Sequence, residues 1–412
     1  MKKSLTVNAI SLMTATIGAN ALGLVFWAVA AHLRSPVIVG RAAAAIAALT
    51  LLSVIAQLNL TNVNVRLLPA AGMLAGGLVR RGYLAVVPLS LVAGVVYCAS
   101  GLGRHVVTGG WAQYAEFIAA VPVLAVFALE DSVLTALRLA PWVAAENITT
   151  AVARIALLPV LAVSAVSAMG VVWSWVLPAA AAAIIVNSLL FGRALPAHGS
   201  VAGTLPGRRR LLSFVAAEYA GSICATATVQ VVPLLVVWRL GPASAAYLTL
   251  PWLIASGVGL VMWNVAGAFV VEVAGSRGHP GTLLRRSLLL WAAIVVSAMV
   301  VCVAGARPLL ALVGPGYVAR GVPLLRLLGL SVPFTALVVL YSTLAWLDQR
   351  VWLLAAFQAC TGTLLLVLTL VLLPHSGLTA VGWAYLATQA GAAAAVTPFT
   401  VRHIRRAEFR RA

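Results

Sequence analysis

Charged residues are scarce in this sequence. Only 8% of its 412 residues are Asp, Glu, Lys or Arg, and only eight of them are acidic. A soluble domain normally has about a quarter of its residues charged, whereas this chain is 63% hydrophobic with a mean hydropathy of +1.08. We therefore expect it to lie in a lipid bilayer, which a helix crosses with roughly 20 apolar residues.

The residue patterns of several enzyme classes are missing as well. No GxxxxGK[ST] phosphate-binding loop is present, so the chain carries no P-loop ATPase domain. The four cysteines fall inside apolar runs without CxxC spacing, which indicates small apolar helix residues rather than metal ligands or disulfides. The six histidines are scattered, and no Ser-His-Asp arrangement is credible. We expect no catalytic residue, no metal and no cofactor.

The net charge of +19 raises the question of nucleic-acid binding. The basic residues, however, fall in short segments between the apolar runs and at the C-terminus. An even number of spans puts both termini on one side of the membrane, and most of the basic residues lie in the segments on that side. Positive residues are enriched in this way in cytoplasmic loops. The pattern predicts a multi-pass protein with both termini in the cytoplasm and no nucleic-acid partner.

About twelve apolar segments are long enough to span a bilayer. The first follows Met1-Lys2-Lys3 but contains polar residues and runs to position 31, so we expect a retained span rather than a signal peptide. A polar linker at 193–210 separates a lobe at 1–192 from a lobe at 211–401, and a basic cytoplasmic tail follows at 402–412. The expected helices are 5–31, 39–62, 82–101, 111–137, 148–167, 171–191, 211–238, 243–271, 287–305, 324–347, 352–373 and 378–401.

The two halves carry related patterns. Pro36, in FWAVAAHLRSPVIVGR, has a counterpart about half the chain later at Pro242, in VVPLLVVWRLGPASAAY. Further matches follow in the same order, including Arg80-Arg81 with Arg285-Arg286, Ser132 with Ser342, Trp142 with Trp352 and Trp173 with Trp383. Such a series indicates a duplication. Six spans per half would insert both halves the same way up, which predicts two parallel six-helix bundles with a central cleft between them.

Several stretches also carry a likeness to a known family. They read FWAVAAHLRSPVIVGRAAA with NVNVRLLPAAG, ALEDSVLTALRLAPWVAAENITTAVARIALLP, VVPLLVVWRLGPASAAYLTLPWLIASG with FVVEVAG, and LVGPGYVARGVPLLRLLGLSVPFTALVVLYSTLAWLDQR with SGLTAVGWAYLATQ. In their order and twelve-span layout, the chain resembles the lipid-linked oligosaccharide (polysaccharide) flippases of the multidrug/oligosaccharidyl-lipid/polysaccharide exporter superfamily.

The resemblance implies a MATE-like fold and a place in the bacterial plasma membrane. It also implies alternating-access translocation of polyprenyl-diphosphate-linked glycans, with membrane lipid and the glycan polymerase machinery as partners. A cation-coupled multidrug antiporter on the same fold is the alternative, although the shortage of intramembrane acids argues against it. A polyprenyl-sugar glycosyltransferase is more remote, because no long outer loop carries the paired Asp or Glu that it would need.

Ionisable residues inside a bilayer are functional candidates, because burying them is expensive. Glu130 and Asp131 lie about two turns before the end of one expected helix, and Arg154 lies about two turns into the next. These two helices form a hairpin, so Arg154 is expected to meet one of the carboxylates. The pair is either structural or a pair that opens when a diphosphate or a proton competes for it.

Glu218 lies at a similar depth, and either binds a coupling Na⁺ or H⁺ or is neutralised in the headgroup zone by Arg208 to Arg210. Arg66 stands in NVRLLP, where the family usually carries arginine, and its guanidinium suits a diphosphate. The alternative for Arg66 is an ordinary positive-inside anchor. Its counterpart in the repeat is Glu272, which suggests cytoplasmic mouths of opposite charge.

Arg34 and Arg239 occupy the outer turns of the first and seventh expected helices, together with Arg41. They either receive the emerging diphosphate or anchor the protein in the outer leaflet. Amides buried in these spans, including Asn20 and Asn264, either hydrogen-bond between helices or line a sugar-binding cleft.

Overall fold

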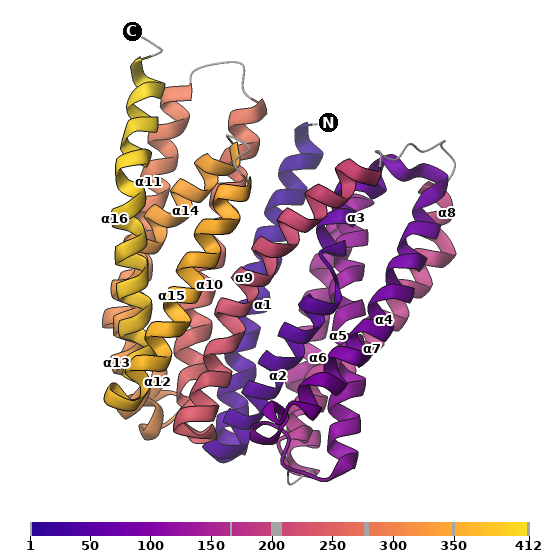
Figure 1. The fold of residues 1–412 in the computed structure, drawn as a ribbon, viewed down its shortest axis with the longest axis vertical. Coiled ribbons are helices and arrows are strands. Elements are labelled where there is room, and N and C mark those ends of the chain that lie inside the picture. The colour runs from indigo at the N-terminus through magenta and orange to yellow at the C-terminus, as the bar shows by residue number, and fades with distance from the viewer. Residues whose placement is uncertain (1, 165–166, 199–207, 276–279, 348–350, 410–412) are drawn as a thin grey trace. The chain divides into compact units, whose positions relative to one another are not determined.

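The structure is a computed structural model that describes residues 2–164, 167–198, 208–275, 280–347 and 351–409. These ranges are helical and contain no strand, which confirms the predicted all-α fold (Figure 1). The chain forms two compact units, Met1–Ala246 and Tyr247–Ala412. The first unit reaches beyond the linker because α9 packs along α2; the lobe at 1–192 and the linker at 193–210 stay predictions.

The first unit contains the helices that position the candidate functional site described below. Its core joins α3, α4, α5 and α7 through Leu68, Val79, Val133 and Val186. A second set of contacts runs between α1, α6 and α7 (Figure 1). The elements are α1 (Lys2–Leu33), α2 (Pro36–Ala56), α3 (Leu60–Ala71), η1 (Gly72–Leu74), α4 (Ala75–Ala99), η2 (Leu102–His105), α5 (Trp111–Ala136), α6 (Ala140–Ser164), α7 (Met169–Leu189), η3 (Leu190–Ala194), α8 (Leu195–His198) and α9 (Arg208–Leu240).

The second unit is built around α16, which packs against α13, α14 and α15. A separate apolar cluster joins Met262, Trp291 and Val339. The elements are α10 (Pro242–Gly275), which begins in the first unit, α11 (Pro280–Met299), η4 (Val300–Ala304), α12 (Ala306–Ala311), α13 (Pro315–Leu330), α14 (Val332–Leu347), α15 (Val351–Ser376) and α16 (Thr379–Phe409).

The helix lengths suit a membrane. Among the described residues, eight helices are long and apolar enough to cross a bilayer, or nine if α13 and α14, which are bent by 44°, form one span. Each of the twelve segments expected from the sequence overlaps a helix, whereas the number of twelve spans stays a prediction. The chain therefore has the composition and helix lengths of a multi-pass membrane protein.

The expected helix at 39–62 is in fact two helices. The chain breaks between α2 and α3, where Leu58 and Asn59 have φ angles of 49° and 61°. Polar residues around the break are held by α5: Ser53 donates to the Val121 carbonyl at 3.2 Å, and Gln57 and Asn59 are buried. Hydropathy alone misses the break, because these polar contacts with α5 come from a distant part of the sequence.

The repeated turns around Pro36 and Pro242 lie against each other. Pro36 stands in the first turn of α2, where a missing N–H costs nothing. A Cβ placed on Gly40 of α2 would lie 1.7 Å from the Pro242 carbonyl oxygen and 2.9 Å from the Ala246 nitrogen. Only glycine permits this approach of the two helices, because both neighbours are backbone atoms that cannot move aside.

Gly40→Ala is therefore expected to destabilise the protein by about 1–3 kcal/mol, the usual range for overpacking. Thermal unfolding of the purified protein in detergent would measure it. Gly76→Ala is the matched control, since a Cβ there meets nothing within 4 Å and α4 gains helix propensity. Equal unfolding temperatures for the two variants would contradict the close packing.

Candidate functional site

Two carboxyl groups are buried together in the first unit. Glu130 on α5 is 0% exposed and Glu146 on α6 is 8% exposed. Asn187, from α7, donates from Nδ2 to Oε2 of Glu130 at 2.5 Å. The other oxygen of Glu130 and both oxygens of Glu146 accept no hydrogen bond from a described donor. The two carboxyl groups lie within hydrogen-bonding range of each other, and we refer to Glu130 and Glu146 as the carboxyl pair.

The carboxyl pair has no cation beside it in the part of the chain that the structure describes, since neither residue forms an ion pair there. Two ionised carboxylates at this distance repel strongly where the dielectric constant is low. If the two groups share one proton, the protonated acid donates a hydrogen bond and the ionised acid accepts it. Each carboxyl group then has the other as a hydrogen-bond partner. The arrangement is thus suited to holding and releasing a proton.

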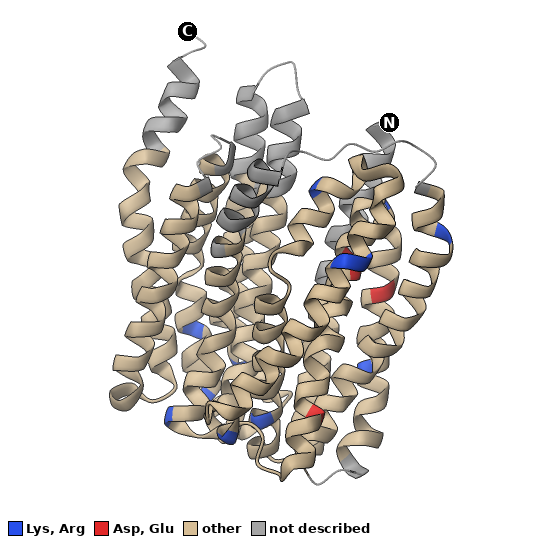
Figure 2. Ribbon diagram, turned by 45° about the vertical axis from the view of Figure 1, so that its right-hand side comes forward, with Lys and Arg blue, Asp and Glu red and all other residues tan. Residues whose placement is uncertain are grey.

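Polar groups from three further positions surround the carboxyl pair. Asp131 follows Glu130 and accepts from Nδ2 of Asn147 at 3.2 Å. The Tyr83 hydroxyl of α4 is buried beside Asn187 and Glu130. Among the side chains that the structure describes, acidic ones occur on the first unit only (Figure 2). No group of three or more described His, Cys, Asp or Glu residues is placed to hold a metal ion.

Arg154 on α6 lies in a separate, aromatic site. Its guanidinium is 4.0 Å from the ring centroid of Trp175 and 5.9 Å from that of Phe127. Trp175 in turn packs edge-on against Phe26 of α1, with ring centroids 5.1 Å apart. The buried Nε of Arg154 has no hydrogen-bond partner, and the guanidinium forms no ion pair with a described residue. Cation–π contact therefore provides its main described stabilisation.

The expected meeting of Arg154 with Glu130 or Asp131 is wrong for the described residues. The sequence reading began the helix at position 148, whereas α6 begins at Ala140. Arg154 therefore lies fourteen residues along α6, roughly 21 Å from its start at 1.5 Å per residue. Glu146 instead reaches the level of Glu130, because each lies six residues from the turn that joins α5 and α6.

The other predicted arginines lie at different places. Arg66 is exposed on α3, and Arg34 is half-buried between α1 and α2. Arg239 is exposed near the end of α9, with its guanidinium 4.2 Å from the Trp238 ring centroid. Their roles toward a substrate stay predictions.

The remaining predicted residues are not brought together by the described structure. Asn20 is half-buried on α1 of the first unit, and Asn264 is half-buried on α10 within the second. The side chains of Glu218 and Glu272 are not among those that the structure describes. Their assignment to coupling stays a prediction.

The sequence reading missed Glu146 because it placed this residue in a loop. Pro141 was the available signal, since proline is favoured in the first turn of a helix. Starting the helix at Ala140 would have put Glu146 and Asn147 on the wall that faces α5.

Comparison with solved structures identifies the fold. The chain is similar to a multidrug resistance MATE family transporter of the MOP superfamily in its inward-facing conformation, with 12% identity, a TM-score of 0.65, and coverage of 98% of this chain and 96% of that one. The outward-facing conformation of such a transporter matches with 12% identity, a TM-score of 0.57, and 97% and 96% coverage. A MATE transporter from Vibrio cholerae matches with 13% identity, a TM-score of 0.53, and 98% and 97% coverage. No protein-family model and no curated protein matches the sequence.

Proposed function

We propose that this chain is a secondary transporter that flips a polyprenyl-diphosphate-linked oligosaccharide from the cytoplasmic to the outer leaflet of the bacterial plasma membrane. The MATE-like fold supports a transporter. The sequence resemblance to polysaccharide flippases supports the lipid-linked glycan. The two predicted lobes would rock about the cleft between them, with both termini in the cytoplasm and the glycan polymerase machinery outside as consumer.

The observation that carries the substrate proposal is Arg154. A half-buried cation with no acidic partner among the described residues is available to an anionic ligand, and guanidinium matches phosphate oxygens with its fork of donors. The Trp175 face holds the group in place, so less freedom is lost when the ligand binds. A cationic drug would be repelled from this site.

The carboxyl pair supports coupling to a proton. We assign the coupling proton to Glu130 and Glu146, with Asp131 beside them, in place of the pairing with Arg154 expected from the sequence. The same pair favours the second candidate function, a cation-coupled multidrug antiporter, because proton exchange at buried acids serves either substrate class.

The two functions are separated by reconstitution in proteoliposomes. A fluorescent polyprenyl-diphosphate oligosaccharide is expected to become accessible to an outer-leaflet quencher only when the protein is present. Loss of the protein from cells is expected to leave the lipid-linked intermediate in the cytoplasmic leaflet. Proton-driven exchange of a cationic dye without any flipping of the glycan lipid would overturn the flippase in favour of the antiporter.

A further inference from the structure

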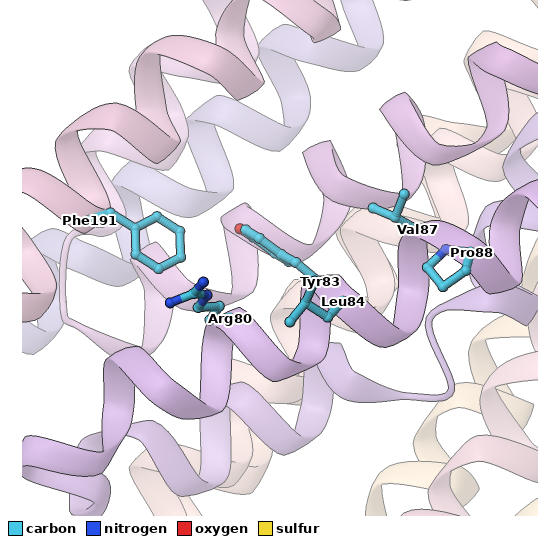
Figure 3. Close-up of a pocket in the computed structure, with 6 residues that line it drawn as sticks. All are labelled: Arg80, Tyr83, Leu84, Val87, Pro88 and Phe191. Carbon is cyan, nitrogen blue, oxygen red and sulfur yellow. The ribbon is translucent and has the colours of Figure 1, made fainter.

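A groove of about 550 Å³ runs along the exposed side of α4 in the first unit (Figure 3). Its residues on α4 recur every three or four positions, so they form a single stripe on one face of the helix. The stripe extends roughly 12 Å from Arg80 to Pro88, at 1.5 Å per residue. The lining residues are Arg80, Tyr83, Leu84, Val87, Pro88 and Phe191.

Charge and apolar surface are segregated along this groove. The guanidinium of Arg80 lies at one end, between the rings of Tyr83 and Phe191, and Val87 and Pro88 lie at the other (Figure 3). The two rings meet edge-on with centroids 6.1 Å apart. Arg80 is the one charged residue of the lining, so the groove offers a cation at the start of α4 and an apolar channel leading from it.

The surface beside the groove has the composition of a face in contact with hydrocarbon. Leu84 in the groove is 66% exposed, and Val92 further along α4 is 56% exposed. Ile184 on α7 is 69% exposed. Exposed apolar side chains on helices long enough to span a bilayer are expected to contact lipid. The molecule nearest to the groove in a membrane is therefore a lipid.

We propose that the α4 groove binds an anionic phospholipid, with the phosphate at Arg80 and one acyl chain along Leu84, Val87 and Pro88. Guanidinium pairs with phosphate oxygens in a bidentate way, and basic pockets between membrane helices are known to take anionic headgroups. The volume falls within the range of ordinary ligand sites. This site is distinct from the aromatic site at Arg154 and does not depend on which substrate is moved.

Tyr83 connects the groove to the surroundings of the carboxyl pair. The ring of Tyr83 forms part of the groove wall, while its hydroxyl lies beside Asn187 and Glu130. A bound acyl chain would thus contact the ring of Tyr83, whose hydroxyl lies near the carboxyl pair. Lipid occupancy is expected to stabilise the first unit around α4 and α7.

Native mass spectrometry of the full chain tests the proposal, with phosphatidylglycerol and phosphatidylcholine of identical acyl chains as the two probes. Arg80→Gln is expected to weaken phosphatidylglycerol binding about fivefold, the effect of one basic residue at an anionic headgroup. Arg81→Gln is the matched control, because Arg81 is exposed on the next position but does not line the groove. Arg81→Gln should weaken phosphatidylglycerol binding by less than about twofold.

A second pair of variants tests the apolar channel. Leu84→Trp fills the groove and is expected to reduce phosphatidylglycerol binding to the level of Arg80→Gln. Leu91→Trp, two turns further along the exposed side of α4, should leave binding unchanged.

Equal effects of Arg80→Gln and Arg81→Gln, or equal wild-type binding of the two lipids, would overturn the proposal. So would binding of a polyprenyl phosphate that phosphatidylglycerol does not displace. The comparison of the two phospholipids does not depend on glycan flipping, whereas polyprenyl phosphate binding would make the groove a site for the carrier lipid. The proteoliposome assay tests the proposed function separately.

Discussion

Replacing Arg154 with Gln is expected to reduce flipping of the lipid-linked glycan by about 100-fold. A hydrogen bond to a charged group contributes about 1.5–3 kcal/mol, and a guanidinium gives a phosphate two of them at once. Gln keeps one donor group but loses the charge and the stacking on Trp175. Arg154→Lys keeps the charge without the planar fork and should fall between wild type and Gln. The initial flipping rates of both variants are measured in proteoliposomes at saturating and at limiting substrate concentrations.

Arg154→Met separates substrate binding from folding. A half-buried cation with no described counter-ion is costly to desolvate, so an apolar side chain of similar length should leave the unfolding temperature unchanged or raise it. Transport should nevertheless be lost. Arg104→Gln, at an exposed position of η2, is the control expected to keep wild-type rates. A large drop in stability of Arg154→Met with near-normal flipping by the folded fraction would show that Arg154 serves structure and not substrate.

The helices could be predicted from the sequence because their apolar runs are long. Each expected segment overlaps a helix, and the turn at Pro36 was placed correctly before α2. The break between α2 and α3 could not be predicted in the same way. It depends on Ser53 and Gln57 meeting the carbonyl groups of α5, 68 positions away in the sequence, and such long-range partners leave no local pattern.

The site was predicted in part. Glu130 and Asp131 were found because acids inside apolar runs are rare, and Arg154 was found for the same reason. Which of them meet depends on helix register, and an error of eight residues at the start of α6 replaced Glu146 by Arg154 as the partner of Glu130. Only the fold brings Asn187 and Tyr83 to the same place, since they come from α7 and α4.

Replacing Glu146 with Gln is expected to remove the dependence of transport on pH. If the carboxyl pair takes up one proton in each cycle, the rate should change by up to about tenfold per pH unit while proton binding is limiting. Gln resembles the protonated acid and supplies a permanent donor to Glu130. The rate of Glu146→Gln should therefore be flat where the wild type varies. Flipping rates at a series of equal internal and external pH values measure the difference.

Glu130→Gln should flatten the same profile, because the proton belongs to the pair and not to one residue. The neighbouring polar groups are Asp131 on α5, Asn187 on α7 and Tyr83 on α4. Glu116→Gln is the control, since this acid lies elsewhere on α5 and accepts a hydrogen bond from Trp173 at 3.0 Å. Its profile should match the wild type. If Glu146→Gln keeps a normal profile while folded, the carboxyl pair does not carry the coupling proton, and the acids act only in packing α5 against α6 and α7.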